Sequence, residues 1–213
     1  MKLEYKVEKP ILDESTHTYT LAGKKIIGAN EFLKLNGVGG DFSKIPEFIL
    51  ERARDLGTAV HLTIQYYDEG DLDESTISEP LKPYLEAYKK FLADYKPEIL
   101  AIEAAVQFKE TIAGTLDKIL RIKRRNIVLD LKTSTTLHKS TELQLEIYKI
   151  EAQYSFGVKI HDKWVLQLKK DGTYFVKRYD NDFTDRKAIK GYLEAYGWHK
   201  KNRRKKRKTK KCA

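Results

Sequence analysis

Apolar and polar residues follow two different periods in the first half of the chain, and these periods predict a hairpin followed by helices. Strict alternation over 17–28, typical of a half-buried strand pair, predicts a β-hairpin that turns at Ala22-Gly23. Apolar residues then recur every three or four positions, and the predicted helices cover 29–36, 44–70 and 79–95. Gly57 is a candidate interruption of the second helix, and Pro83 favours a start of the third helix near that residue.

The second half combines longer apolar runs with strand-forming composition. The predicted extended segments are 98–109, 112–122, 126–133, 159–169 and 173–179. Asp171-Gly172 predicts a hairpin turn between the last two of them. Amphipathic helices are expected over 139–156 and 183–199. We expect a single domain over 1–199, with the hairpin and first helices in 1–96, a strand-rich core in about 97–180 and a closing helix.

Length and composition fit one globular domain of 213 residues with a sizeable core. No apolar run approaches the roughly 20 residues of a membrane span, and the N-terminus lacks the apolar stretch of a secretory signal. The single cysteine, Cys212, excludes an intramolecular disulfide and four-cysteine zinc or iron–sulfur sites. An intracellular protein without a membrane partner is the expectation.

The net charge of +10 is concentrated at the C-terminal end. Residues 200–213 contain ten Lys or Arg and no acid, which leaves 31 basic and 31 acidic side chains in residues 1–199. Such a block is expected to be disordered or extended, and it could bind a polyanion with salt-sensitive affinity. We expect DNA contact, with a nuclear-localisation-like run or a solubilising end as alternatives. The candidate contacts here are Arg203, Arg204, Lys205, Lys206 and Arg207.

Charged residues interrupt two of the predicted strands. If 112–122 and 127–133 form a hairpin centred between Arg124 and Arg125, Asp117 lies opposite Lys132, and Ile119 opposite Asp130. Strand alternation then places Asp117, Asp130 and Lys132 on one face. The other face is apolar: Leu116, Leu120, Ile122, Ile127, Leu129 and Leu131. Two close carboxylates suit a hard divalent cation, and an adjacent lysine suits phosphodiester hydrolysis, whereas a structural Asp–Lys pair is the alternative.

Asp117 followed by Asp130-Leu131-Lys132 resembles the signature of PD-(D/E)XK nucleases. Three further stretches resemble motifs of the RecB-like branch, which includes phage-type recombination exonucleases and CRISPR-adaptation exonucleases. In order with the two metal-ligand strands, these motifs are "RDLGTAVH", "AIEAAV", "AGTLD", "VLDLKTS" and "ELQLEIY", and they span 54–148. Leu116 replaces the proline of the signature. The iron–sulfur cluster of some relatives is excluded by the cysteine count, and no ATPase motif is present, so helicase activity would need a partner protein.

The resemblance implies an α/β fold with a restriction-endonuclease-like core, a mixed sheet flanked by helices. It implies that Mg²⁺ or Mn²⁺ is bound by His61, Asp117, Asp130 and the backbone carbonyl of Leu131. Lys132 would position the attacking water and stabilise negative charge. Glu103 would reach a second metal or its water. The remaining implied residues, one helical turn apart, are Gln144 and Tyr148, which would hold Lys132 or the scissile strand.

The sequence therefore predicts a Mg²⁺-dependent deoxyribonuclease that processes DNA ends in recombination, repair or replication, in a virus or mobile element among other settings. An exonuclease is the first expectation, and a nickase or junction resolvase is the second. A non-catalytic DNA-binding module on a nuclease fold is the alternative from another class. Lys139 is a further candidate phosphate contact, with a solvated charge as the alternative, and a homo-oligomer or a recombination partner stays open.

Overall fold

The computed structural model describes residues 3–40, 43–180 and 183–209, with backbone alone for 202–209. The chain divides into two compact units, Met1–Asp180 and Asn181–Ala213. The domain expected over 1–199 stays a prediction. The second unit contains one helix, α5 (Phe183–Thr209). The expected disordered segment is therefore helical over 200–209, because Lys and Arg are good helix formers and no proline interrupts them. Residues 210–213 lie outside the described part.

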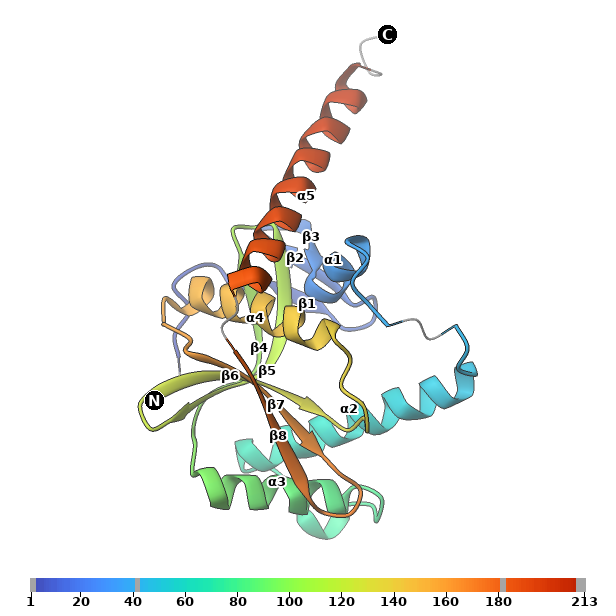
Figure 1. Cartoon of the computed structure of the whole chain (residues 1–213), viewed down its shortest axis with the longest axis vertical. Coiled ribbons are helices and arrows are strands. Elements are labelled where there is room, and N and C mark those ends of the chain that lie inside the picture. The colour runs from blue at the N-terminus through green and yellow to red at the C-terminus, as the bar shows by residue number, and fades with distance from the viewer. Residues whose placement is uncertain (1–2, 41–42, 181–182, 210–213) are drawn as a thin grey trace. The chain divides into compact units, whose positions relative to one another are not determined.

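The first unit is built on one eight-stranded mixed sheet with the order β1-β2-β3-β5-β6-β7-β8, and β4 pairs with β5 (Figure 1). Two neighbouring pairs, β3–β5 and β6–β7, are parallel, and the other pairs are antiparallel. The strands are β1 (Ile11–Asp13), β2 (Thr18–Leu21), β3 (Lys24–Gly28), β4 (Glu98–Phe108), β5 (Ile112–Ile122), β6 (Arg125–Lys132), β7 (Asp162–Leu168) and β8 (Tyr174–Tyr179). The hairpin and the later strands are confirmed, while the short β1 was not predicted. The α/β class with a mixed sheet is confirmed.

Helices cover both faces of this sheet (Figure 1). They are α1 (Ala29–Leu35), α2 (Glu47–Glu69), the 3₁₀ turn η1 (Glu74–Thr76), α3 (Lys82–Tyr95) and α4 (Ser140–Phe156). Helix α3 begins beside Pro83, as predicted. Helix α2 continues without a break through Gly57, so the candidate interruption is wrong. In the part of the chain with described placement, no helix is both long and apolar enough to traverse a membrane.

The β5–β6 hairpin differs from the expected register by two residues. Its turn is Lys123-Arg124, with φ of 46° and 67°, and the observed pairs include Ile119↔Val128. The predicted pairs of Asp117 with Lys132 and of Ile119 with Asp130 are therefore wrong. Two central residues with positive φ form the tight turn that matches strand twist, so the loop is shorter than expected. A shift of two preserves side-chain alternation, and the predicted apolar face is kept.

That apolar face packs against α2 and α3. The buried cluster contains Val60, Ile64, Tyr84, Ala87, Tyr88, Phe91, Leu120, Ile127, Leu129, Leu131, Trp164, Leu166 and Leu168. Lys118 belongs to the same strand face but is fully buried and charged, which the sequence pattern did not explain. Helix α4 packs on the opposite face, over β4 to β7. Asp117 and Asp130 point toward this second layer, because side chains alternate along a strand.

Candidate active site

The site forms where β5 and β6 separate. Their ladder ends at the pair Lys118↔Leu129, after which β5 continues beside β4 and β6 continues beside β7. The backbone of Leu131 therefore lacks a β5 partner. Its N–H donates to Asp117 Oδ2 at 2.5 Å, and its carbonyl oxygen lies 3.2 Å from His61 Nε2. The divergence of the two strands thus leaves the backbone N–H and carbonyl of Leu131 without a partner on β5. Asp117 and His61 supply the hydrogen-bond partners that buried backbone groups require.

Three candidate metal ligands meet at this point. One ligand atom from each of His61, Glu103 and Asp117 lies within 4.8 Å of the others. His61 Nδ1 is 3.8 Å from Glu103 Oε1 and 3.8 Å from Asp117 Oδ1. An imidazole with two carboxylates fits Mn²⁺, and the carboxylates also fit Mg²⁺. Glu103, predicted to reach a second metal or its water, thus lies with two of the predicted ligands, while Asp130 lies beside this group in an ion pair.

Glu103 has an unusual backbone conformation for a strand residue. Its φ is +41°, although its neighbours on β4 pair regularly with β5, as Ile102↔Lys118 and Ala104↔Leu116. The left-handed region costs a non-glycine residue about 1–2 kcal/mol, and such strain concentrates at functional sites. The conformation accompanies a carboxylate that is only 3.8 Å from His61. We interpret the strained residue as one held in place for its side chain rather than for the ladder.

Asp130 and Lys132 form a close ion pair on the same face of β6. Lys132 Nζ lies 2.8 Å from Asp130 Oδ1 and 2.7 Å from Oδ2. Burial lowers the pKa of Lys132, but the charges of Asp130 and Asp117 outweigh it and raise the pKa above 10.5. Lys132 is therefore an ammonium group at neutral pH. It is suited to orienting water and stabilising anionic charge, not to removing a proton.

Burial also shifts the pKa values of the acids and the histidine. It raises the pKa of Asp117 and raises that of Asp130 to about 6, although nearby Lys132 opposes both shifts. Burial lowers the pKa of His61, but the neighbouring Glu103 and Asp117 overcome it and raise the pKa to about 9. A divalent cation would displace protons from these groups, so its affinity should increase with pH.

Gln144 and Tyr148 face this cleft from α4. Gln144 Nε2 donates to Asn30 Oδ1 at 2.8 Å and to the Tyr148 hydroxyl at 3.3 Å. Burial, together with the charges of Asp130 and Asp117, raises the pKa of Tyr148 well above 10, so its hydroxyl stays neutral. Asn30 was not predicted, because no local signal marks a contact between residues 114 positions apart. That either side chain holds Lys132 stays a prediction.

A cleft of about 970 Å³ brings these groups together. The side chains of all the predicted catalytic and metal-binding residues line it: His61, Glu103, Asp117, Asp130, Lys132, Gln144 and Tyr148. The N-terminal hairpin region also lines the cleft, with Lys9 and His17, neither of which was predicted. Lys139 lies at the N-terminus of α4, exposed and outside the cleft lining. The side chains of the predicted DNA contacts in 203–207 lie outside the described residues.

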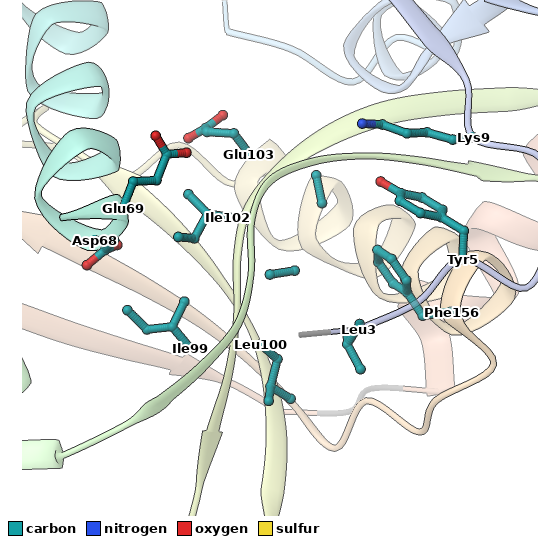
Figure 2. Close-up of a pocket in the computed structure, with 12 residues that line it drawn as sticks. Leu3, Tyr5, Lys9, Asp68, Glu69, Ile99, Leu100, Ile102, Glu103 and Phe156 are labelled. Atoms are coloured by element: carbon teal, nitrogen blue, oxygen red, sulfur yellow. The ribbon is translucent and has the colours of Figure 1, made fainter. Parts of the chain in front are cut away.

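A second, smaller cavity of about 280 Å³ adjoins the site along β4. Figure 2 shows Glu103 at its upper wall, Lys9 and Tyr5 on one side, and Asp68 with Glu69 of α2 on the other. Glu103 and Lys9 line both this cavity and the cleft. Glu103 therefore lies between the cleft and the smaller cavity.

No family model matches the chain, and no curated protein matches it by sequence. Among solved structures, it is similar to an alkaline exonuclease, LHK-Exo, from Laribacter hongkongensis. The similarity has 11% identity and a TM-score of 0.44, and it covers 88% of this chain and 95% of that one. The same enzyme in complex with dAMP gives 11% identity, a TM-score of 0.43 and the same coverage.

Proposed function

We propose that this protein is a divalent-metal-dependent deoxyribonuclease that hydrolyses phosphodiester bonds, acting as an exonuclease on DNA ends in recombination, repair or replication. The observation that carries the proposal is the meeting of His61, Glu103 and Asp117 beside the Asp130–Lys132 pair in one cleft. The motifs that resemble RecB-like nucleases supply these residues in the expected chain order. Metal ligands next to a fixed ammonium group suit phosphoryl chemistry better than they suit a structural role.

The residues can be assigned roles in the cleavage step. His61, Glu103 and Asp117 would hold the cation, and Asp130 would join them through its carboxylate. When bound, Mg²⁺ or Mn²⁺ would neutralise charge on the scissile phosphate and favour ionisation of a nearby water. The ammonium of Lys132 would orient the attacking water and stabilise charge that develops on the phosphoryl oxygens. The neutral Tyr148 hydroxyl and the Gln144 amide would donate hydrogen bonds to the bound strand.

DNA as the substrate is supported by charge as well as by the motifs. The segment of residues 200–213 carries ten basic side chains, enough to neutralise several phosphates without reading sequence. We propose that it contributes salt-sensitive affinity through Arg203, Arg204, Lys205, Lys206 and Arg207. Cleavage of linear DNA should therefore weaken as ionic strength increases, which a rate series in salt will measure.

The experiment compares linear, nicked and closed circular DNA, end-labelled where linear, with Mg²⁺, Mn²⁺ or EDTA. We expect degradation of linear DNA only, loss of activity in EDTA, and recovery on adding metal. A labelled 5′ or 3′ end gives the polarity. Cleavage of closed circles or junctions would instead assign an endonuclease, and metal-independent binding without any cleavage would assign a DNA-binding module.

Two variants test the residues themselves. Lys132→Met should lower the cleavage rate by about 10²–10³-fold, the usual effect of removing one preorganised electrostatic group, while metal binding persists. Asp117→Asn should weaken both metal binding and cleavage. Lys170→Met, at the exposed β7–β8 turn, is the matched control and should keep full activity. Full activity of Lys132→Met would end the assignment of its role.

A further inference from the structure

A buried ion pair joins the helix that carries His61 to the strand that carries Asp117. Lys118 Nζ of β5 lies 2.5 Å from Asp68 Oδ2 of α2, and both side chains are 1% exposed. The Tyr88 hydroxyl of α3 donates to both oxygens of Asp68, at 3.0 and 2.9 Å. The Lys118 ammonium also lies 5.5 Å from the centre of the Tyr88 ring. Side chains from α2, β5 and α3 therefore meet at the Asp68 carboxylate, and both of its oxygens have a partner.

Each partner of the ion pair lies on the same element as a residue of the site. Asp68 follows His61 by seven residues, about two helical turns, so the two side chains lie along the same side of α2. Lys118 directly follows Asp117, and alternation sends the two side chains to opposite faces of the sheet. A shift of α2 along β5 would therefore change the 3.8 Å separation of His61 from Asp117 and break the ion pair.

A buried ion pair is by itself weak evidence for a role in stability. Replacing a buried ion pair by apolar residues of similar size is often neutral or stabilising, because two charges need not be desolvated. The surrounding cluster is apolar, with Ile64 and Leu120 fully buried near the two partners in sequence. Apolar packing alone tolerates small shifts between a helix and a sheet, whereas a short ion pair with two hydrogen bonds fixes both position and rotation.

We propose that Asp68 and Lys118, supported by Tyr88, are positioning residues that fix α2 on β5 so that His61 reaches the metal site. The inference rests on the proposed function for its metal, and it deepens that function by assigning what sets the ligand geometry. Asp68 lines the small cavity of Figure 2, and Glu103 lines both that cavity and the cleft. Neither Asp68 nor Lys118 lines the cleft, so in this proposal the pair acts through His61.

The test removes both charges together, as Asp68→Leu with Lys118→Met, so that no single buried charge is left unpaired. We expect a melting temperature equal to or above that of the original protein and Mn²⁺ affinity at least tenfold weaker, measured by calorimetric titration or electron paramagnetic resonance. The Mg²⁺ concentration for half-maximal cleavage should increase by a similar factor. Unchanged Mn²⁺ affinity in a folded double variant would overturn the inference.

A matched control uses a second buried ion pair, between Lys163 of β7 and Glu146 of α4, whose side chains are 0% and 2% exposed. Lys163→Met with Glu146→Leu should leave Mn²⁺ affinity within twofold, because neither residue lies on α2 or β5. An equal loss of affinity in this control would show that any buried-pair removal disturbs the site, and it would also overturn the inference.

A combined variant distinguishes a positioning effect through His61 from a general loosening of the fold. In a His61→Ala background, the Asp68→Leu/Lys118→Met change should alter Mn²⁺ affinity less than twofold, because the positioned ligand is already gone. A full tenfold effect in that background would contradict action through His61. If the original protein binds Mn²⁺ but cleaves no DNA, the proposed nuclease function fails, while the binding titrations still decide the positioning role.

Discussion

Glu151 on α4 is a buried carboxyl group whose proton should make folding depend on pH. The residue is 0% exposed, and neither of its oxygens has a hydrogen-bond partner among the described atoms. Burial raises the pKa of Glu151 well above its ordinary value of 4.5. The folded protein therefore holds this proton to a higher pH than the unfolded chain, which releases it above about pH 4.5. The stabilising difference is complete below pH 4.5 and is lost as pH rises.

The size of the effect follows from proton linkage. One proton bound only by the folded state changes the free energy of unfolding by about 1.4 kcal/mol per pH unit above the unfolded pKa. For as long as the group stays neutral in the fold, the contribution of Glu151 should therefore fall by that amount per pH unit, up to about 3 kcal/mol between pH 5 and pH 7.5. Glu151→Gln removes the titration and keeps the shape. Its free energy of unfolding relative to the original protein should increase by that amount over this range.

Urea denaturation at pH 5, 6, 7 and 7.5 measures the difference directly. Glu31→Gln, an exposed glutamate in the first turn of α1, is the matched control, and its difference should change by less than about 0.5 kcal/mol over the same range. Subtracting the free energy of unfolding of the original protein from that of each variant cancels the titration of every other group. Parallel curves for the original protein and Glu151→Gln would refute the reasoning, because they would place an ionised or hydrated carboxylate inside the fold.

Three further predictions concern packing, the hairpin turn and the metal. Gly114→Ala should destabilise the fold by about 1–3 kcal/mol in urea denaturation, because the new Cβ would lie 2.7 Å from Tyr148 Cε1 and 3.0 Å from Glu151 Oε2. An unchanged free energy of unfolding would show that α4 can move away from β5. Lys123→Asn with Arg124→Gly should raise the free energy of unfolding by about 1 kcal/mol, since both positions have positive φ, and a decrease would contradict the turn assignment. Mn²⁺ at about 100 times its Kd should raise that free energy by about 2.7 kcal/mol, and an unchanged melting curve would argue against a folded-state metal site.

Local periodicity was enough to predict most elements and the layer in which the candidate residues lie. The apolar positions of β5 and β6 fix which face is buried, and this face survives a register error of two residues because side chains alternate. The motif order then predicted the residues that line the cleft, from His61 to Tyr148. Each of these inferences depends on neighbours within one or two elements, where sequence spacing translates directly into geometry.

The tertiary structure decided how the polar groups share the site. The separation of β5 from β6 beyond Lys118↔Leu129 leaves Leu131 free to contact Asp117 and His61, and no local pattern encodes where two strands part. The left-handed conformation of Glu103 likewise depends on strand pairing and packing around it, not on its own preference. The sequence alone determined the elements, their buried faces and the candidate chemistry. Long-range packing determined the distances between side chains, because these depend on how whole elements settle against one another.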